Sequence, residues 1–211
     1  MRRYGKILAK KGWRRTLKLT LIRHGITEGN KRSLYYGRTD LPLLPEGIEA
    51  LQQAVQTMDY PTAQHYYTSG MRRTEQTFAL IYGDIPHGIL PGLREGDFGR
   101  FEMIPFADLQ DDPEYQRWIT DETGTVVCPG GESFVQVYER AMADLLPLLE
   151  RGEDAVCVMH GAAMAALMTR WFHGEEKFFR FIPNPGEGWQ ITFDGMTPRE
   201  RIRIPQKKES V

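Results

Sequence analysis

The chain has 211 residues, of which 41% are hydrophobic and 26% are charged, and its formal net charge is −1 at pH 7. This length supports one domain with a full core and is short for two, and the composition is ordinary for a globular protein. No apolar run in the sequence approaches the length of a membrane span, so we expect no association with a membrane.

The first 18 residues differ in charge from the rest, because they contain eight Lys or Arg and no acidic residue. The remainder has 19 basic and 28 acidic residues, and such an acidic body argues against nucleic acid as a partner. The apolar segment behind the basic start is too brief for a signal peptide. Cys128 and Cys157 have no metal-ligand spacing and do not indicate a disulfide framework. We therefore expect a cytoplasmic enzyme with a basic extension over residues 1–16, more often a solvated arm than a partner site, and a polar tail over residues 206–211.

The stretch LKLTLIRHGITEGN at residues 17–30 predicts a short strand that ends at Arg23 and His24 and then turns at Gly25. Open α/β sheets bind ligands at the carboxyl ends of their strands. The pair therefore suggests a nucleophilic histidine beside an arginine that holds an anion. Taken alone, an Arg-His-Gly sequence after a strand more often has no such role.

The next elements alternate between helix and strand. A loop with glycine and proline precedes a helix at Ile48–Met58, and His65–Thr68 forms a second strand. Ser69 is expected to cap a helix that ends at Gly83, which places Arg72 and Arg73 in its first turn. Free backbone N–H groups and the helix dipole favour an anion there.

Residues 84–131 contain several prolines and glycines, and such a long irregular stretch is typical of a functional lid. Ser133 and Gln136 make a capping box before a helix that Pro147 is expected to kink or shorten. The apolar segment Ala155–Met159 predicts a central strand that ends at His160, followed by a buried helix. Trp189–Phe193 predicts a further strand.

This alternation predicts an α/β fold. Three strands would present Arg23 with His24, then Arg73, then His160 at their ends, each followed by a turn or a helix start. In a broadly parallel sheet these ends share one edge, so we expect the four side chains to converge.

Six segments, taken in order, resemble the histidine phosphatase superfamily, the phosphoglycerate mutase-like enzymes. They are RHGITEGN at 23–30, YGRTDLPLLPEG at 36–47, TSGMRRTEQT at 68–77, LREGDFGRFE at 93–102, PGGES at 129–133 and VMHG at 158–161. The resemblance implies a catalytic domain over residues 17–205. It also implies a three-layer sandwich, with helices flanking a mostly parallel central sheet.

The resemblance implies a nucleophile at His24 that forms a phosphohistidine, and a proton donor and acceptor at Glu95. By spacing alone, Asp97 and Glu102 remain alternatives to Glu95. It also implies a set of residues that hold the phosphate and a set that contacts the rest of the substrate. The first set is Arg23, Asn30, Arg73, His160 and Gly161, and the second is Tyr36, Gly37 and Arg38. His160 is also expected to be catalytic, through a hydrogen bond to the transferring group. Asn30 could instead satisfy a turn, and His160 could be structural.

The family implies a phosphomonoesterase that acts on small phosphorylated metabolites, such as sugar phosphates, phosphoserine or a ribazole phosphate. No metal or cofactor is expected, because phosphoryl transfer to histidine needs mainly positioning and positive charge. A monomer or a homodimer is expected. Two alternatives are a phosphoglycerate mutase-type phosphotransferase and a catalytically silent domain that binds phosphorylated ligands. Mutases of this family tend to carry longer lid insertions, which favours hydrolysis.

Overall fold

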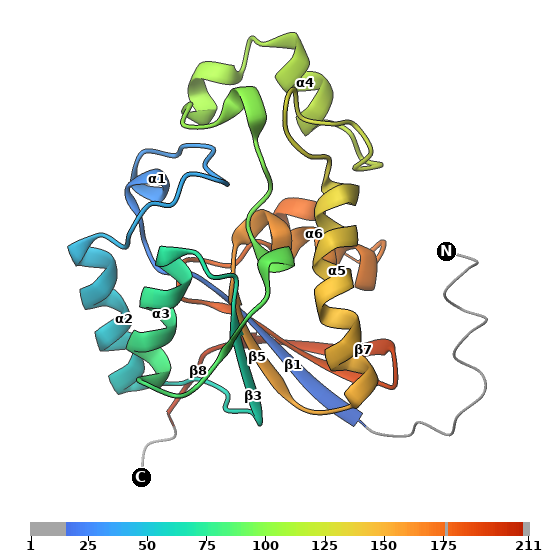
Figure 1. Cartoon of the computed structure of the whole chain (residues 1–211). Helices are drawn as coiled ribbons and strands as arrows, with labels where there is room; N and C mark the ends of the chain where they lie inside the picture. Colours follow the sequence, from blue (N-terminus) through green and yellow to red (C-terminus); the bar gives the residue numbers. More distant parts are fainter. Residues whose placement is uncertain (1–15, 176, 209–211) are drawn as a thin grey trace.

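The computed structural model describes residues 16–175 and 177–208, which form a central sheet with helices on both faces (Figure 1). The predicted N-terminal extension lies outside these residues except for Thr16, which already belongs to the first strand. In this described part, no helix has the length and apolar character that a membrane span requires. The strands are β1 (Thr16–Arg23), β2 (Met58–Asp59), β3 (His65–Thr68), β4 (Gly88–Ile89), β5 (Ala155–Met159), β6 (Gly188–Asp194), β7 (Thr197–Ile204) and β8 (Gln206–Lys207).

The helices differ in length and type. The α-helices are α1 (Glu28–Lys31), α2 (Pro45–Thr57), α3 (Arg72–Tyr82), α4 (Pro113–Ile119), α5 (Phe134–Arg151) and α6 (Gly161–Trp171). The short 3-10 helices are η2 (Pro91–Leu93), η3 (Gly99–Phe101), η4 (Phe106–Leu109) and η5 (Phe178–Phe181).

The sheet has the order β4-β3-β5-β1-β6-β7. Its first four strands are parallel, whereas β6 runs antiparallel to β1 and β7 antiparallel to β6. The predicted α/β fold with a mostly parallel sheet is therefore confirmed. Because β1, β5 and β3 are parallel neighbours, their carboxyl ends lie at one edge, which is where the candidate residues follow.

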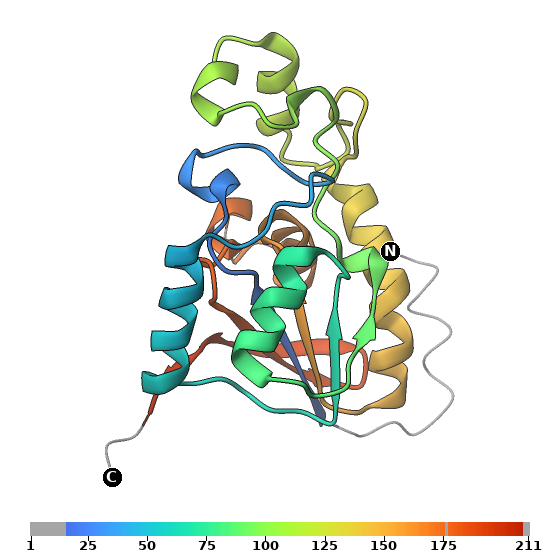
Figure 2. The ribbon, with the colours of Figure 1, turned by 60° about the vertical axis from the view of Figure 1, so that its left-hand side comes forward.

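Alternating side chains of the strands bury two separate faces of the sheet. Leu21 and Cys157 belong to a core shared with α5 and α6. Ile22 and Val158 point to the opposite face and pack in a second cluster with Phe78 of α3. Figure 2 shows α2 and α3 together on one side of the sheet and α5 on the other. Burial on both faces fixes the register of β1, because a one-residue slip would exchange the two sets.

The segment at residues 84–131 begins with β4 at the edge of the sheet, and its later part stands over one end of the sheet in both views, with α4 at its top (Figures 1 and 2). It holds short 3-10 helices and α4, in agreement with its predicted irregularity. It also has a core of its own, in which Phe101, Tyr115 and Trp118 are buried together with Cys128. The predicted lid, called the lid below, thus contains a packed aromatic unit and is not a loose loop.

Two predictions about helix ends were wrong. The second helix begins at Pro45 instead of Ile48, because the fixed backbone angle of proline suits the first helical position. Ser69 does not cap α3. Its N-cap is Met71, and the Ser69 hydroxyl contacts His160 instead.

Two further expectations also need correction. Pro147 does not shorten α5, which continues through it to Arg151, since Leu145 and Leu148 beside the proline are buried in the core; the alternative of a kink stays a prediction. Strand β7 was not predicted, because its exposed, arginine-rich sequence lacks apolar alternation. The start of the expected tail forms β8, which pairs with β2, and residues 209–211 lie outside the described part.

Candidate active site

The first part of the site is built where β1 ends. The backbone N–H of His24 still donates to Met159 O of β5, at 3.0 Å, so the histidine is held against the next strand. Gly25 then turns the chain, and its N–H donates to the Thr77 hydroxyl. A Cβ atom at Gly25 would lie 2.7 Å from the Leu51 side chain, so only glycine fits without rearrangement.

The ring of His24 is held in one orientation by its own turn. Its Nδ1 lies 2.7 Å from Gly25 O, and since a carbonyl only accepts, Nδ1 carries the proton. The lone pair of Nε2 is then free. Burial, followed by the nearby Arg73 and Arg23, lowers the pKa of His24 well below its usual value, so the ring is neutral at pH 7. A neutral, oriented imidazole with an open Nε2 is what nucleophilic attack on phosphorus requires.

His160 follows β5 and caps α6, and its ring centroid lies 5.2 Å from that of His24. The predicted convergence of the two histidines is therefore confirmed. Arg73 Nε donates to His160 Nδ1 at 3.2 Å, so Nε2 carries the proton and donates to Ser69 Oγ at 2.8 Å. Burial, then Arg73 and His24, lowers the pKa of His160 well below its usual value. His160 is thus neutral, with both ring nitrogens occupied.

Arg73 is fully buried and organises the backbone around the site. Besides His160, its guanidinium donates to Thr39 O and Gly37 O, both at 2.9 Å. The N–H groups of Gly37 and Thr39 in turn donate to the carboxylate of Glu102 in the lid. Glu102, this loop, Arg73 and His160 therefore form one continuous hydrogen-bonded chain. Two of the five N–H groups of Arg73 remain for other partners.

Arg23 is the arginine that lines the cavity. Its Nη1 donates to Pro183 O at 2.8 Å, whereas its Nε is buried and has no hydrogen-bond partner among the described residues. A Cβ atom at Gly161 would lie 3.2 Å from that Nε, so glycine leaves space beside it. An unpaired buried guanidinium N–H is costly, and an anion would satisfy it.

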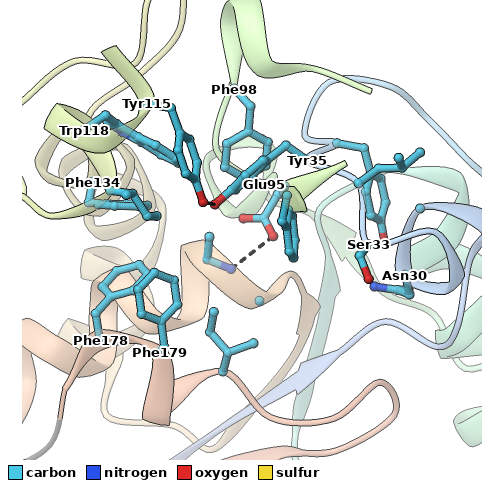
Figure 3. A pocket seen from close by; sticks show the side chains of 18 of the residues that line it. Asn30, Ser33, Tyr35, Glu95, Phe98, Tyr115, Trp118, Phe134, Phe178 and Phe179 are labelled. Atoms are coloured by element: carbon cyan, nitrogen blue, oxygen red, sulfur yellow. Dashed lines mark hydrogen bonds between the residues drawn. The ribbon is translucent and has the colours of Figure 1, made fainter. Parts of the chain in front are cut away.

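Asn30 has one part in a helix cap and another available to a ligand. Its Oδ1 accepts from the backbone N–H and the hydroxyl of Thr27, which forms a capping box at α1. Its side chain also lines the cavity, as Figure 3 shows. The alternative that Asn30 satisfies a turn is thus confirmed, whereas its contact with phosphate stays a prediction, for which the cap leaves the amide nitrogen able to donate.

The three candidate carboxylates have different surroundings. Glu95 lines the cavity, and it accepts from the backbone N–H of Ala162 and of Ala163 at the start of α6, at 3.0 and 2.9 Å (Figure 3). Asp97 accepts from Gly99 N, and Glu102 holds the loop before Arg73; neither lines the cavity. Of the three, only Glu95 can meet a molecule bound there.

The cavity has a volume of about 710 Å³, within the usual range for small-molecule sites. Arg23, His24 and Asn30 line what we call the phosphate end. Of the residues expected to contact substrate, Tyr36 lines the cavity, while Gly37 and Arg38 do not. Sequence reasoning did not select the opposite, aromatic end, because its rings look like ordinary core residues. The aromatic end consists of Tyr35, Tyr115, Trp118, Phe134, Phe178 and Phe179.

Curated proteins with similar sequences are phosphatases and mutases by name. The chain is 30% identical over 161 residues to "Adenosylcobalamin/alpha-ribazole phosphatase" of Salmonella typhimurium, covering 73% of this chain and 79% of that protein. It is 31% identical over 158 residues to "Probable phosphoglycerate mutase GpmB" of Proteus mirabilis, covering 72% of this chain and 74% of that protein.

Solved structures show the same likeness over more of the chain. A putative alpha-ribazole-5'-P phosphatase from Escherichia coli superposes with a TM-score of 0.73 at 26% identity, covering 91% of this chain and 96% of that chain. For a phosphoglycerate mutase from Thermus thermophilus the TM-score is 0.67 at 26% identity, with coverage of 88% and 98%. A sequence profile of the histidine phosphatase superfamily (branch 1) matches residues 19–200. The chain therefore belongs to the histidine phosphatase superfamily.

Proposed function

We propose that this protein is a phosphomonoesterase that hydrolyses small phosphorylated metabolites through a phosphohistidine on His24. One observation carries the proposal. A neutral histidine with a free Nε2 lines the same cavity as an arginine whose buried Nε has no partner. Together they offer a nucleophile and a donor for the phosphate oxygens in one place. The asparagine amide at position 30 supplies a further donor.

In the first step, Nε2 of His24 attacks phosphorus, the ester P–O bond breaks, and the leaving oxygen takes a proton from Glu95. In the second step, Glu95 removes a proton from water, which attacks phosphorus and breaks the P–N bond. Inorganic phosphate leaves and neutral His24 is restored. The backbone N–H groups of Ala162 and Ala163 hold the Glu95 carboxyl group beside the cavity, where both proton transfers take place.

In this proposal His160 is not a free, cationic donor to the phosphate, because both of its ring nitrogens already have partners. Its Nε2–H donates to Ser69 Oγ, and its Nδ1 accepts from Arg73 Nε. It therefore orients Arg73, and it donates to the transferring phosphate only by exchanging Ser69 for a phosphate oxygen.

The test is release of inorganic phosphate from 4-nitrophenyl phosphate in buffer containing a metal chelator. His24→Ala should lower kcat by at least about 10³-fold, because the nucleophile is lost. His65→Ala is the matched control, since His65 begins β3 and its ring contacts Glu153 on the surface. Wild-type turnover by His24→Ala would refute the mechanism.

A mutase is the second candidate, because a similar protein and a similar structure carry that name. Transfer of the phosphoryl group between the hydroxyls of phosphoglycerate that outpaces hydrolysis would favour it. Tight binding of phosphate esters without turnover of any of them would instead favour the silent binding domain.

We also propose that the enzyme acts in the cytoplasm, as a monomer or homodimer. Cys128 and Cys157 are both free and buried, which suits a reducing compartment. Fractionation of cells and light scattering of the purified protein test these two points.

A further inference from the structure

The aromatic end of the cavity is assembled from four separate segments. Tyr35 comes from the loop after α1, Tyr115 and Trp118 from α4, Phe134 from the start of α5, and Phe178 and Phe179 from η5. The rings contact one another, with Trp118 stacked on Phe134 at a centroid distance of 5.0 Å and Phe134 at 4.3 Å from Phe178. They form a continuous wall rather than isolated contacts.

Figure 3 shows how this wall lies relative to the polar residues. Asn30 and Ser33 lie on one side of the cavity, Trp118, Phe134 and Phe178 lie on the other, and Glu95 lies between them. If phosphorus is placed at the phosphate end, the leaving oxygen falls beside Glu95. The group attached to that oxygen then enters the aromatic end.

The charges along the cavity limit what that group can be. In the part of the chain that the structure describes, Arg23 is the only Lys or Arg among the lining residues, and Glu95 is the only carboxylate. The negative charge of one phosphate group is enough to pair with Arg23. A second phosphate or a carboxylate on the substrate would be buried among the rings without a cation.

Trp118 adds a specific polar feature to this wall. The side chain is 1% exposed, and its Nε1 has no hydrogen-bond partner among the described residues. Buried indole N–H groups usually have a partner. Because Nε1 is shielded in this structure, a ligand in the aromatic end would reach it after a small rotation of the indole, and an acceptor atom on that ligand would then supply the partner.

We propose that the substrate is a phosphate monoester whose alcohol portion carries a flat, uncharged heteroaromatic group with a hydrogen-bond acceptor. This inference rests on the proposed phosphatase function. Flat rings pack against the wall in edge or offset-stacked geometry, and the acceptor meets Trp118 Nε1. The volume of about 710 Å³ accommodates a ring system together with the phosphate.

The first experiment measures kcat/KM for two esters of primary alcohols with similar leaving-group acidity and equal charge. They are 2-(quinolinyl)ethyl phosphate and n-octyl phosphate. The aromatic ester should be preferred by about 30-fold, since ring contacts add to the burial that both chains share. 3-Phosphoglycerate should be a poorer substrate than either, because its carboxylate lacks a cation.

The second experiment measures the same ratio in variants. Phe179→Ala should lower the ratio of aromatic to alkyl kcat/KM by about fivefold, and because Phe179 is 54% exposed the variant should fold normally. Trp118→Phe keeps a ring but removes the N–H, so it should lower the preference for quinoline over naphthalene esters. Ile202→Ala, on β7 and 51% exposed, is a control that should leave the ratio unchanged.

Each outcome has a distinct meaning. Equal kcat/KM for the aromatic and alkyl esters, or a ratio that Phe179→Ala does not change, overturns this inference and leaves the phosphatase proposal intact. No phosphate release from any ester overturns the phosphatase proposal itself. A wild-type preference for quinoline over naphthalene that survives in Trp118→Phe removes the part assigned to the indole N–H.

Discussion

The two ends of the cavity are built in different ways. At the phosphate end, His24 directly follows a central strand, and a network of buried hydrogen bonds fixes His160 and Arg73 beside it. At the aromatic end, rings from the lid, α5 and η5 meet with few hydrogen bonds among them. Catalysis at the phosphate end depends on the exact positions of hydrogen-bonded atoms. Binding at the aromatic end depends on the shape of the substrate and on its lack of charge.

Because of this difference, we expect catalytic rate and substrate preference to respond to different substitutions. Reaction geometry belongs to the phosphate end, so substitutions there should affect every ester. Choice of substrate belongs to the aromatic end, so substitutions there should alter the ratio between esters. Glu95 lies between the two ends and should show both behaviours.

The largest effect at this boundary is expected from Glu95→Gln, which removes the proton donor. With an alkyl phosphate, kcat should fall about 10²- to 10⁴-fold, because an alkoxide is a poor leaving group. With 4-nitrophenyl phosphate the loss should be much smaller, since nitrophenolate leaves unprotonated. The two substrates are compared in steady-state assays.

Asp97→Asn is the matched control, because Asp97 is a nearby carboxylate that does not line the cavity. An equal loss with both substrates in Glu95→Gln would indicate only a structural role. A large, leaving-group-dependent loss in Asp97→Asn would transfer the proton-donor role to that residue.

At the phosphate end, Arg73→Lys should lower kcat about 100-fold for aromatic and alkyl esters alike. A lysine keeps the charge but cannot reproduce the planar set of bonds to His160, Gly37 and Thr39. Urea unfolding should also show a loss of about 2–3 kcal/mol, because buried carbonyls lose their donors.

Arg72→Lys is the control for this change, since Arg72 is the exposed neighbour in the same helical turn. Glu102→Gln should give a weaker version of the Arg73 effect, because it loosens the loop that Arg73 holds. A changed ratio between esters in Arg73→Lys would show that the two ends are not separable.

The effect expected to be smallest near neutral pH is a dependence of stability on pH that arises at the phosphate end. In the folded protein, burial lowers the pKa of His24 and His160 well below the 6.5 of an unperturbed histidine. The unfolded chain therefore binds more protons below that pH. The stabilisation is complete above pH 6.5 and is lost as the pH falls, by about 1.4 kcal/mol per pH unit for each histidine.

Urea unfolding at several pH values between 5 and 8 would measure this slope. His24→Asn should remove the contribution of His24 to the slope of stability against pH, whereas Phe179→Ala at the aromatic end should leave the slope unchanged. A slope that is the same in His24→Asn would mean that His24 already titrates normally in the folded protein.

The sequence could predict the phosphate end because strand ends have a simple geometry. Once β1, β3 and β5 are parallel, His24 and His160 must emerge at the same edge of the sheet. Sequence could not show that Ser69 would bond to His160 rather than cap a helix, since both uses need the same hydroxyl. It also could not show that Glu102 would hold the loop at Gly37, because that contact spans the lid.

The aromatic end escaped prediction for a different reason. Phe134 and Phe178 are distant in the chain, and apolar rings in helices usually signify core packing. The repeated phenylalanines at residues 178–181 were the available signal, yet their role depends on the lid that faces them. The helices and the strand of the lid are short, so its sequence gives too little periodicity for its packing to be deduced.

The most direct test of the central claim is to find the phosphoryl group on the enzyme. The protein would be mixed with excess phosphate ester for milliseconds to seconds, quenched in alkali, in which phosphohistidine survives, and digested for mass spectrometry and ³¹P NMR. We expect phosphate on Nε2 of His24, because Nδ1 donates its proton to Gly25 O. Phosphate on any other side chain, or a turning-over enzyme in which His24 stays unmodified throughout, would contradict it.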